Sequence, residues 1–181
     1  MIVSRNEVHG VLRKAGLGAK VAAGTADDLA NATSWMEARG VGAMASALDY
    51  LASGQAAQLN FATVFDRIAA GESAVVVEAA DTLLIGFAAG AAGAYGMTFS
   101  IEWDGAQAIV GADGYALDAA VAVGTAKVAR GGHVAATPLL ETIEIDDALW
   151  ARANKMAAEY YVPATEASRL GGAGAGVNDN D

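Results

Sequence analysis

The strongest constraint on the fold of this chain is a strict alternation of apolar and polar residues from Met97 to Asp104. Successive side chains of a β-strand face opposite ways, so this pattern predicts a strand with one buried and one exposed face. Asp104-Gly105 follows directly. Asp-Gly favours a two-residue hairpin turn with positive φ at both central positions. We therefore predict a hairpin whose second strand covers 107–111.

Weaker signals extend this hairpin into a sheet. A second Asp-Gly pair, Asp113-Gly114, precedes a short run that we predict to be a strand over 115–117. Further β-prone runs predict strands over 74–77, 120–130 and 142–145, with Gly131-Gly132 as a turn. Strands joined by tight turns are antiparallel, so the sheet is predicted to be mainly antiparallel.

Helical periodicity dominates the first half of the chain. Ser4 and Glu7 are spaced as in a capping box, and apolar side chains then recur every three or four residues. Later helices are predicted from Thr25–Asp28 to Gly40, from Met44 to Gly54, from Phe61 to Gly71, over 83–94 and over 146–160. We interpret the acidic pairs Asp27-Asp28 and Asp146-Asp147 as helix caps, because negative charge stabilises a helix N-terminus.

These elements predict an α+β fold, with N-terminal helices and a C-terminal helix packed on a small, mainly antiparallel sheet. We expect one domain over 1–162 and a Gly-rich acidic tail over 163–181. The uncharged stretch from Thr82 to Ile101, with its Gly86-x-x-x-Gly90 spacing, is the one candidate membrane span. Its Ala and Gly content and its lack of flanking Lys or Arg favour a buried helix followed by a strand.

Charge and composition exclude several classes of protein. The chain has 21 Asp and Glu against 11 Lys and Arg, a formal net charge of −10. Nucleic acids and anionic membranes are bound through clustered basic residues, so neither partner is expected. Cysteine is absent, which excludes disulfides and thiolate chemistry. The first ten residues lack the apolar run of a signal peptide, so a cytoplasmic location is expected.

The histidines and most glycines suggest no specific chemistry. His9 and His133 have no partner at metal-ligand spacing, and we interpret both as surface or hydrogen-bonded residues, with a catalytic base at His133 left open. Gly172, Gly174 and Gly176 lack the following helix that dinucleotide binding needs. No cofactor and no metal are therefore predicted.

The C-terminal tail is the least generic segment. Arg169 is suited to hold a carboxylate or phosphate, and Glu166 is the first acid–base candidate. Glycines let a backbone approach a ligand closely. The predicted ligand-binding residues are Tyr161, Thr165, Ser168, Arg169, Gly172, Gly174 and Gly176. The alternative is a flexible acidic tail in which Glu166 and Arg169 form a local ion pair.

The tail also carries a resemblance. The stretch from Tyr161 to Leu170, the Gly-Ala repeat at 172–176 and the final Asp-Asn-Asp resemble the C-terminal signature of a bacterial domain-of-unknown-function family. The start at 4–8, the stretch at 32–40 and the hairpin at 103–105 are similar to that family as well. The resemblance implies no established activity, but a polar signature at the chain end favours a functional tail.

Two functions remain open at this stage. The leading hypothesis is a small-molecule-binding protein or metabolic enzyme whose tail closes over a pocket, within one chain or across a homodimer. The alternative is a non-enzymatic accessory subunit whose tail docks into a partner protein. The first predicts a concave pocket with perturbed titratable groups, and the second an exposed apolar patch.

Overall fold

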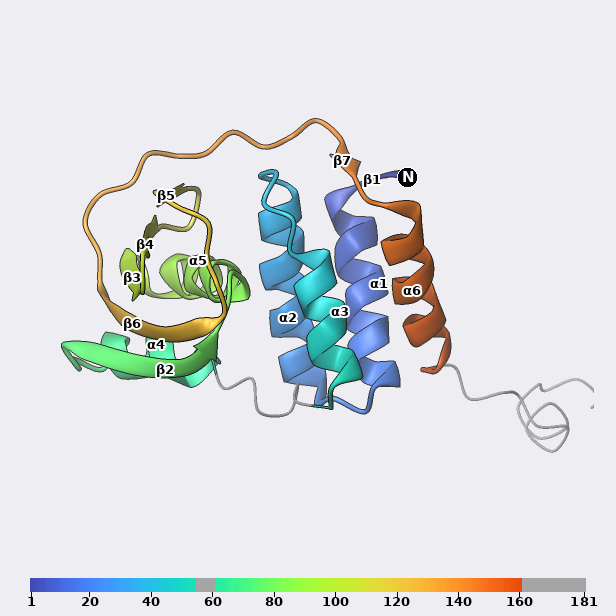
Figure 1. Cartoon of the computed structure of the whole chain (residues 1–181), viewed down its shortest axis with the longest axis horizontal. Coiled ribbons are helices and arrows are strands. Elements are labelled where there is room, and N and C mark those ends of the chain that lie inside the picture. The colour runs from blue at the N-terminus through green and yellow to red at the C-terminus, as the bar shows by residue number, and fades with distance from the viewer. Residues whose placement is uncertain (55–60, 161–181) are drawn as a thin grey trace, which may run out of the picture.

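The structure is a computed structural model that describes residues 1–54 and 61–160. Figure 1 shows a helical side and a sheet side within these residues. The helices are α1 (Arg5–Gly18), α2 (Ala23–Glu37), α3 (Met44–Ala52), α4 (Phe61–Ala69), α5 (Leu83–Tyr95) and α6 (Asp147–Ala158). The strands are β1 (Ile2–Val3), β2 (Ala74–Ala80), β3 (Phe99–Trp103), β4 (Ala106–Val110), β5 (Tyr115–Leu117), β6 (Gly124–Arg130) and β7 (Ile143–Glu144). The predicted α+β class is confirmed.

The main sheet has five strands in the order β2-β6-β3-β4-β5, and every pairing is antiparallel. The predicted hairpin is confirmed, with Trp103 opposite Ala106. Its turn differs from the prediction, because Gly105 has φ +79° whereas Asp104 does not have positive φ. This arrangement leaves the left-handed conformation to glycine alone. The strand predicted over 120–130 begins only at Gly124.

The first helix is capped as predicted. The Ser4 backbone N–H donates to the Glu7 carboxylate at 2.7 Å, and the Glu7 N–H donates to the Ser4 hydroxyl at 3.3 Å. At the other end of the chain, Asp146 caps α6 by accepting hydrogen bonds from two backbone N–H groups. Its neighbour Asp147 instead pairs with the N-terminal ammonium at 2.7 Å. That ion pair holds the start of the chain against the start of α6.

The acidic pair Asp27-Asp28 is not a helix cap, so this interpretation is wrong. Helix α2 begins at Ala23, and no side chain caps it. Both aspartates therefore lie in its second turn. Asp27 instead joins two helices, because its carboxylate accepts a hydrogen bond from Nε of Arg13 on α1 at 2.7 Å. Asp28 has a different environment, described below.

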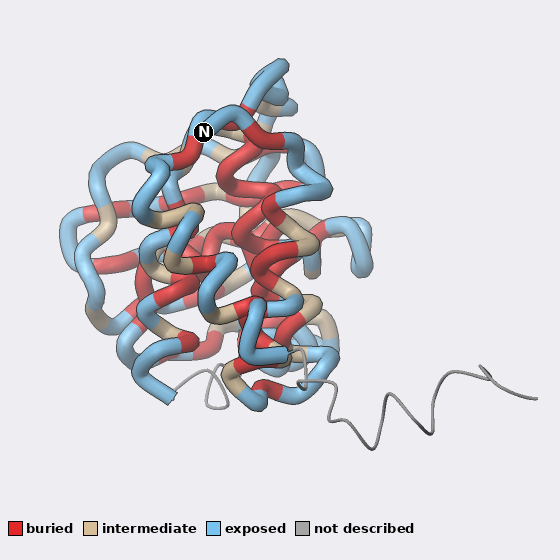
Figure 2. Tube along the Cα trace, turned by 90° about the vertical axis from the view of Figure 1, so that its right-hand side faces the viewer, coloured by how far each residue is buried: buried red, intermediate tan, exposed pale blue. Residues whose placement is uncertain are grey.

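Helix α2 lies at the centre of the helical side. It packs against α1 on one side and α5 on the other, while α6 packs on the far side of α1 (Figure 1). Its second half is buried almost all round, and the small side chains of Ala30, Ala32 and Ser34 permit this close packing. Figure 2 shows the buried segments running through the middle of the molecule.

Helix α5 connects the two sides of the molecule, because it packs against α2 and against β3 and β4. The stretch 82–101 is thus a buried helix followed by a strand, as predicted. Within residues 1–54 and 61–160, no helix has the length and apolar character needed to cross a membrane. Beside α5, helix α4 packs on β2 and β6.

Candidate functional site

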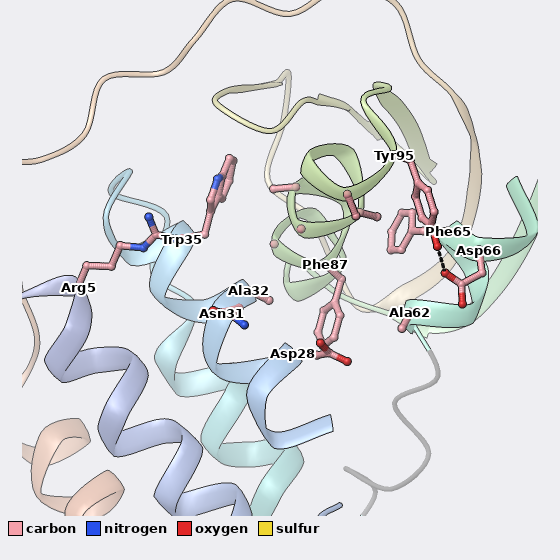
Figure 3. A pocket seen from close by; sticks show the side chains of 15 residues that line it. Arg5, Asp28, Asn31, Ala32, Trp35, Ala62, Phe65, Asp66, Phe87 and Tyr95 are labelled. Carbon is pink, nitrogen blue, oxygen red and sulfur yellow. Dashed lines mark hydrogen bonds between the residues drawn. The ribbon is translucent and has the colours of Figure 1, made fainter. Parts of the chain in front are cut away.

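The candidate site is a groove of about 400 Å³ bounded by α2, α4 and α5 and reached at one end by the start of α1 (Figure 3). Aromatic, small and charged side chains share its walls. The lining residues are Arg5, Asp28, Asn31, Ala32, Trp35, Ala62, Phe65, Asp66, Gly86, Phe87, Ala89, Gly90, Ala91, Ala94 and Tyr95. All of these except Arg5 come from α2, α4 and α5.

One wall of the groove is a single face of α2. Asp28, Asn31 and Trp35 are three and four residues apart, which places them on the same side of the helix. Trp35 is held rigidly, since its indole N–H donates to the carbonyl of Ala112 at 2.9 Å and its ring meets that of Tyr115 edge-on at 6.0 Å between centroids. Asp28 has no ion pair and no hydrogen bond to its side chain within the described residues.

The opposite wall comes from α4 and the end of α5. The hydroxyl of Tyr95 donates to Oδ1 of Asp66 at 2.6 Å, the contact drawn as a dashed line in Figure 3. This bond fixes one carboxylate oxygen of Asp66 and leaves the other without a hydrogen bond in the described part of the chain. The same bond raises the pKa of Tyr95, so the phenol keeps its proton at neutral pH.

Helix α5 forms the floor of the groove. At Gly86 an added Cβ would lie 2.6 Å from the carbonyl oxygen of Ala32, so only glycine allows α5 to approach α2 this closely. Gly86 is thus a point of close packing between the two helices. At Gly90, one turn further on, an added Cβ would meet nothing within 4 Å. The volume of the groove therefore depends on the small residues of this helix.

The two ends of the groove differ in charge. Asp28 and Asp66, both exposed, form the acidic end, and partial burial, then Asp27, then Asp66 raise the pKa of Asp28. Arg5 lines the other end, without an ion-pair partner among the residues that the structure describes. The Arg13–Asp27 pair shows that α1 and α2 run antiparallel, which places Arg5 beside Trp35 rather than beside Asp28.

Two further hollows contain a titratable side chain, but neither brings together opposing charged groups from the described part of the chain. The one of about 300 Å³ beside β2 contains Asp81, which is 7 % exposed and accepts a hydrogen bond from the Leu83 N–H at 2.9 Å. That bond starts α5, so Asp81 already has a structural role. The other, of about 460 Å³, is lined by Arg130 and His133 and by no carboxylate of the described residues. Within that part of the chain, no lining group would activate His133 as a catalytic base.

The structure tests none of the catalytic and ligand-binding residues predicted in the tail. Tyr161, Thr165, Glu166, Ser168, Arg169, Gly172, Gly174 and Gly176 all lie outside the described residues. His9 lies with its Nε2 3.8 Å from Oδ1 of Asp27, in keeping with a surface histidine. In residues 1–54 and 61–160, no three acidic or histidine side chains lie close enough together to hold a metal ion.

Sequence reasoning missed the groove residues. The available signal was the spacing of Asp28, Asn31 and Trp35 along one helical face, where polar residues interrupt an otherwise buried helix. The interpretation of Asp28 as a helix cap obscured this spacing. Asp66 and Tyr95 carried no such signal, because only the packing of α4 against α5 brings them together.

Comparison with known proteins gives a match to a family model. The family model described as "Protein of unknown function (DUF3726)" matches residues 3–72, so this segment is similar to an uncharacterised family. The predicted resemblance is confirmed at that level, whereas the C-terminal signature lies outside both the match and the described residues. No curated protein and no solved structure matches the chain. The matched segment includes Arg5, Asp28 and Asp66.

Proposed function

We propose that this protein binds a small organic molecule with a positively charged amine in the groove between α2, α4 and α5. The observation that carries the proposal is that Asp28, which has no ion pair among the described residues, lines the same cavity as Asp66. A pocket of this size, mostly apolar with a few convergent polar groups, is typical of small-molecule sites. The net charge of −10 also favours a cationic ligand over an anionic one.

The groove offers two kinds of contact to such a ligand. An ammonium group at the acidic end would be attracted by both carboxylates. It would also reduce the electrostatic repulsion between Asp28 and Asp66. The rings of Phe65 and Phe87, with the alanines of α5, would pack against its apolar body. Aromatic rings near an ammonium add a favourable cation–π term.

Calorimetric titration with two probes of equal chain length tests this proposal. We expect 1,6-diaminohexane to bind the full-length protein and hexanedioate not to bind. Asp28→Asn and Asp66→Asn should each weaken diamine binding by about tenfold or more, since each removes one charge-assisted contact. Glu159→Gln, beyond the end of α6, makes the same change in net charge away from the groove and should leave binding unchanged.

Three results would refute the proposal. They are no diamine binding, equal binding of both probes, or an equal loss in the Glu159→Gln variant. The last result would mean that the overall charge of the protein, rather than the groove, attracts the diamine.

The predicted closure by the tail is a separate part of the proposal. Helix α6 is separated from the groove by α1 and α2, a distance of roughly 20 Å for two helix diameters. The nineteen residues of 163–181 could span roughly 60 Å if extended, so such a closure is within reach. A chain that ends at Val162 should then bind 1,6-diaminohexane more weakly and release it faster. Unchanged affinity would refute closure by the tail but would not contradict ligand binding in the groove.

The accessory-subunit alternative has an observation of its own. Large apolar side chains are exposed beside the β1–β7 pair, namely Ile2 at 71 %, Leu139 at 57 % and Leu140 at 49 %. Exposed apolar clusters are common at protein interfaces. If this function holds, Leu139→Ser with Leu140→Ser should abolish co-purification of a partner without changing diamine binding. Retained co-purification would argue against docking at this surface.

A further inference from the structure

The two ends of the groove carry opposite charge, and this limits the ligand further. Asp28 and Trp35 are seven residues apart on α2, so the acidic end and the Trp35 end are separated by roughly 10 Å along the helix. Arg5 lies beside the Trp35 end. A ligand that fills the groove therefore meets carboxylates at one end and a guanidinium at the other.

A second arginine, Arg39, lies next to this end of the groove without lining it. Arg39 stacks on the ring of Trp35, 3.9 Å from its centroid, and donates to the carbonyls of Trp35 and Asp113. These contacts hold its charge beside Arg5, and burial followed by the charge of Arg5 lowers the pKa of Arg39. Its Nε is buried with no hydrogen-bond partner in the described part of the chain. The repulsion between the two arginines, which the charge of Asp113 offsets in part, favours an anion at Arg5.

We propose that the ligand is a zwitterion similar to an amino acid, an inference that rests on the proposed amine site. Its carboxylate is held by Arg5, and its ammonium lies between Asp28 and Asp66. Asn31, which lies on α2 between the two ends, can donate to or accept from the middle of such a ligand. Arginine suits this role because its planar guanidinium binds a carboxylate with two parallel hydrogen bonds. Ordinary hydrogen-bond lengths at both ends leave room for a chain of several methylenes across roughly 10 Å.

The test compares 6-aminohexanoate with 1,6-diaminohexane by calorimetric titration of the full-length protein. We expect the zwitterion to bind about tenfold more tightly than the diamine, because it gains a charge-assisted contact at Arg5. Arg5→Met should remove this preference while leaving diamine affinity unchanged or slightly improved. Arg5→Lys should restore part of it. Arg130→Met, which removes the same charge outside the groove, should keep the full preference.

The outcomes separate the inference from the proposed function. If the diamine binds in an Asp28-dependent way and 6-aminohexanoate binds no better, the zwitterion is wrong and the amine site stands. If Arg5→Met weakens both probes equally, Arg5 has only a structural role and the inference also fails. If neither probe binds, the amine site itself is wrong, and the inference falls with it.

Discussion

Helix α5 contains two glycines one turn apart that predict opposite effects of the same substitution. At Gly86 a new methyl group would lie 2.6 Å from the carbonyl oxygen and 2.9 Å from the Cα of Ala32, both backbone atoms. A backbone cannot rotate away as a side chain can, so α2 and α5 must separate. At Gly90 the same methyl group would meet no atom within 4 Å. Gly86→Ala and Gly90→Ala are thus a matched pair.

The magnitudes follow from two terms. Replacing glycine by alanine inside a helix contributes about 1 kcal/mol in favour of folding. Overpacking costs about 1–3 kcal/mol, and a clash with backbone belongs at the upper end. Gly86→Ala should therefore lower the free energy of unfolding by about 2 kcal/mol, and Gly90→Ala should raise it by about 0.5–1 kcal/mol. For a chain of this length, these values correspond to a Tm lower by about 4–8 °C and higher by about 1–4 °C.

Urea unfolding followed by circular dichroism at 222 nm measures both variants against the wild type. Equal stability of the two variants, or a more stable Gly86→Ala, would refute the packing of α5 on α2 that creates the groove. A second readout uses the same proteins. The methyl group of Gly90→Ala projects into the groove, so this variant should bind 6-aminohexanoate more weakly even though it is more stable.

Three further predictions concern buried and titrating carboxylates. Glu37 is 7 % exposed and accepts from the N–H groups of Ala43 and Met44 at 2.6 and 2.7 Å; Glu37→Ala should cost about 3 kcal/mol in urea unfolding and Glu37→Gln clearly less, and equal losses would contradict the capping role. Burial raises the pKa of Asp81 in the folded protein, so its contribution to stability is full below the unfolded value of about 3.9 and is lost as the pH rises through the folded value. Asp81→Asn should therefore gain stability relative to the wild type as the pH rises above about 4, and parallel stability curves would refute this. The pKa of Asp28 is also raised, so diamine affinity should fall as the pH drops and this carboxylate becomes protonated. If the affinity measured by titration does not change with pH above about 4, Asp28 is not the amine contact.

The parts of the fold that depend on local sequence were predictable. The alternation before Asp104-Gly105 and the capping box at Ser4 each involve neighbours in the chain, and both are confirmed. The start of α2 was missed, because Ala22 offers no side-chain cap and the polar residues at Thr25–Asp28 imitate one. Asp27 is polar for its contact with Arg13, which the sequence of α2 alone cannot show.

The groove was beyond sequence reasoning for a different reason. Its acidic end combines Asp28 and Asp66, which are thirty-eight positions apart and belong to helices of different layers. The hydrogen bond from Tyr95 to Asp66 spans 29 positions. Periodicity identifies the buried face of each helix but not the angle or depth at which two faces meet. A cavity is a product of that angle, so it appears only once the helices are packed.

The family match divides the groove into two contributions. The charged groups Arg5, Asp28 and Asp66 lie within the matched segment 3–72, whereas the floor comes from α5, outside it. The charges determine which kind of ligand is attracted, and the glycines and alanines of α5 determine whether there is space for it. A protein that shares these three charged residues but has bulky residues on the helix equivalent to α5 would keep the charge pattern and lose the cavity. A match to this family model therefore does not by itself assign the proposed ligand to another protein. That assignment needs both the three charged residues and the small residues of α5.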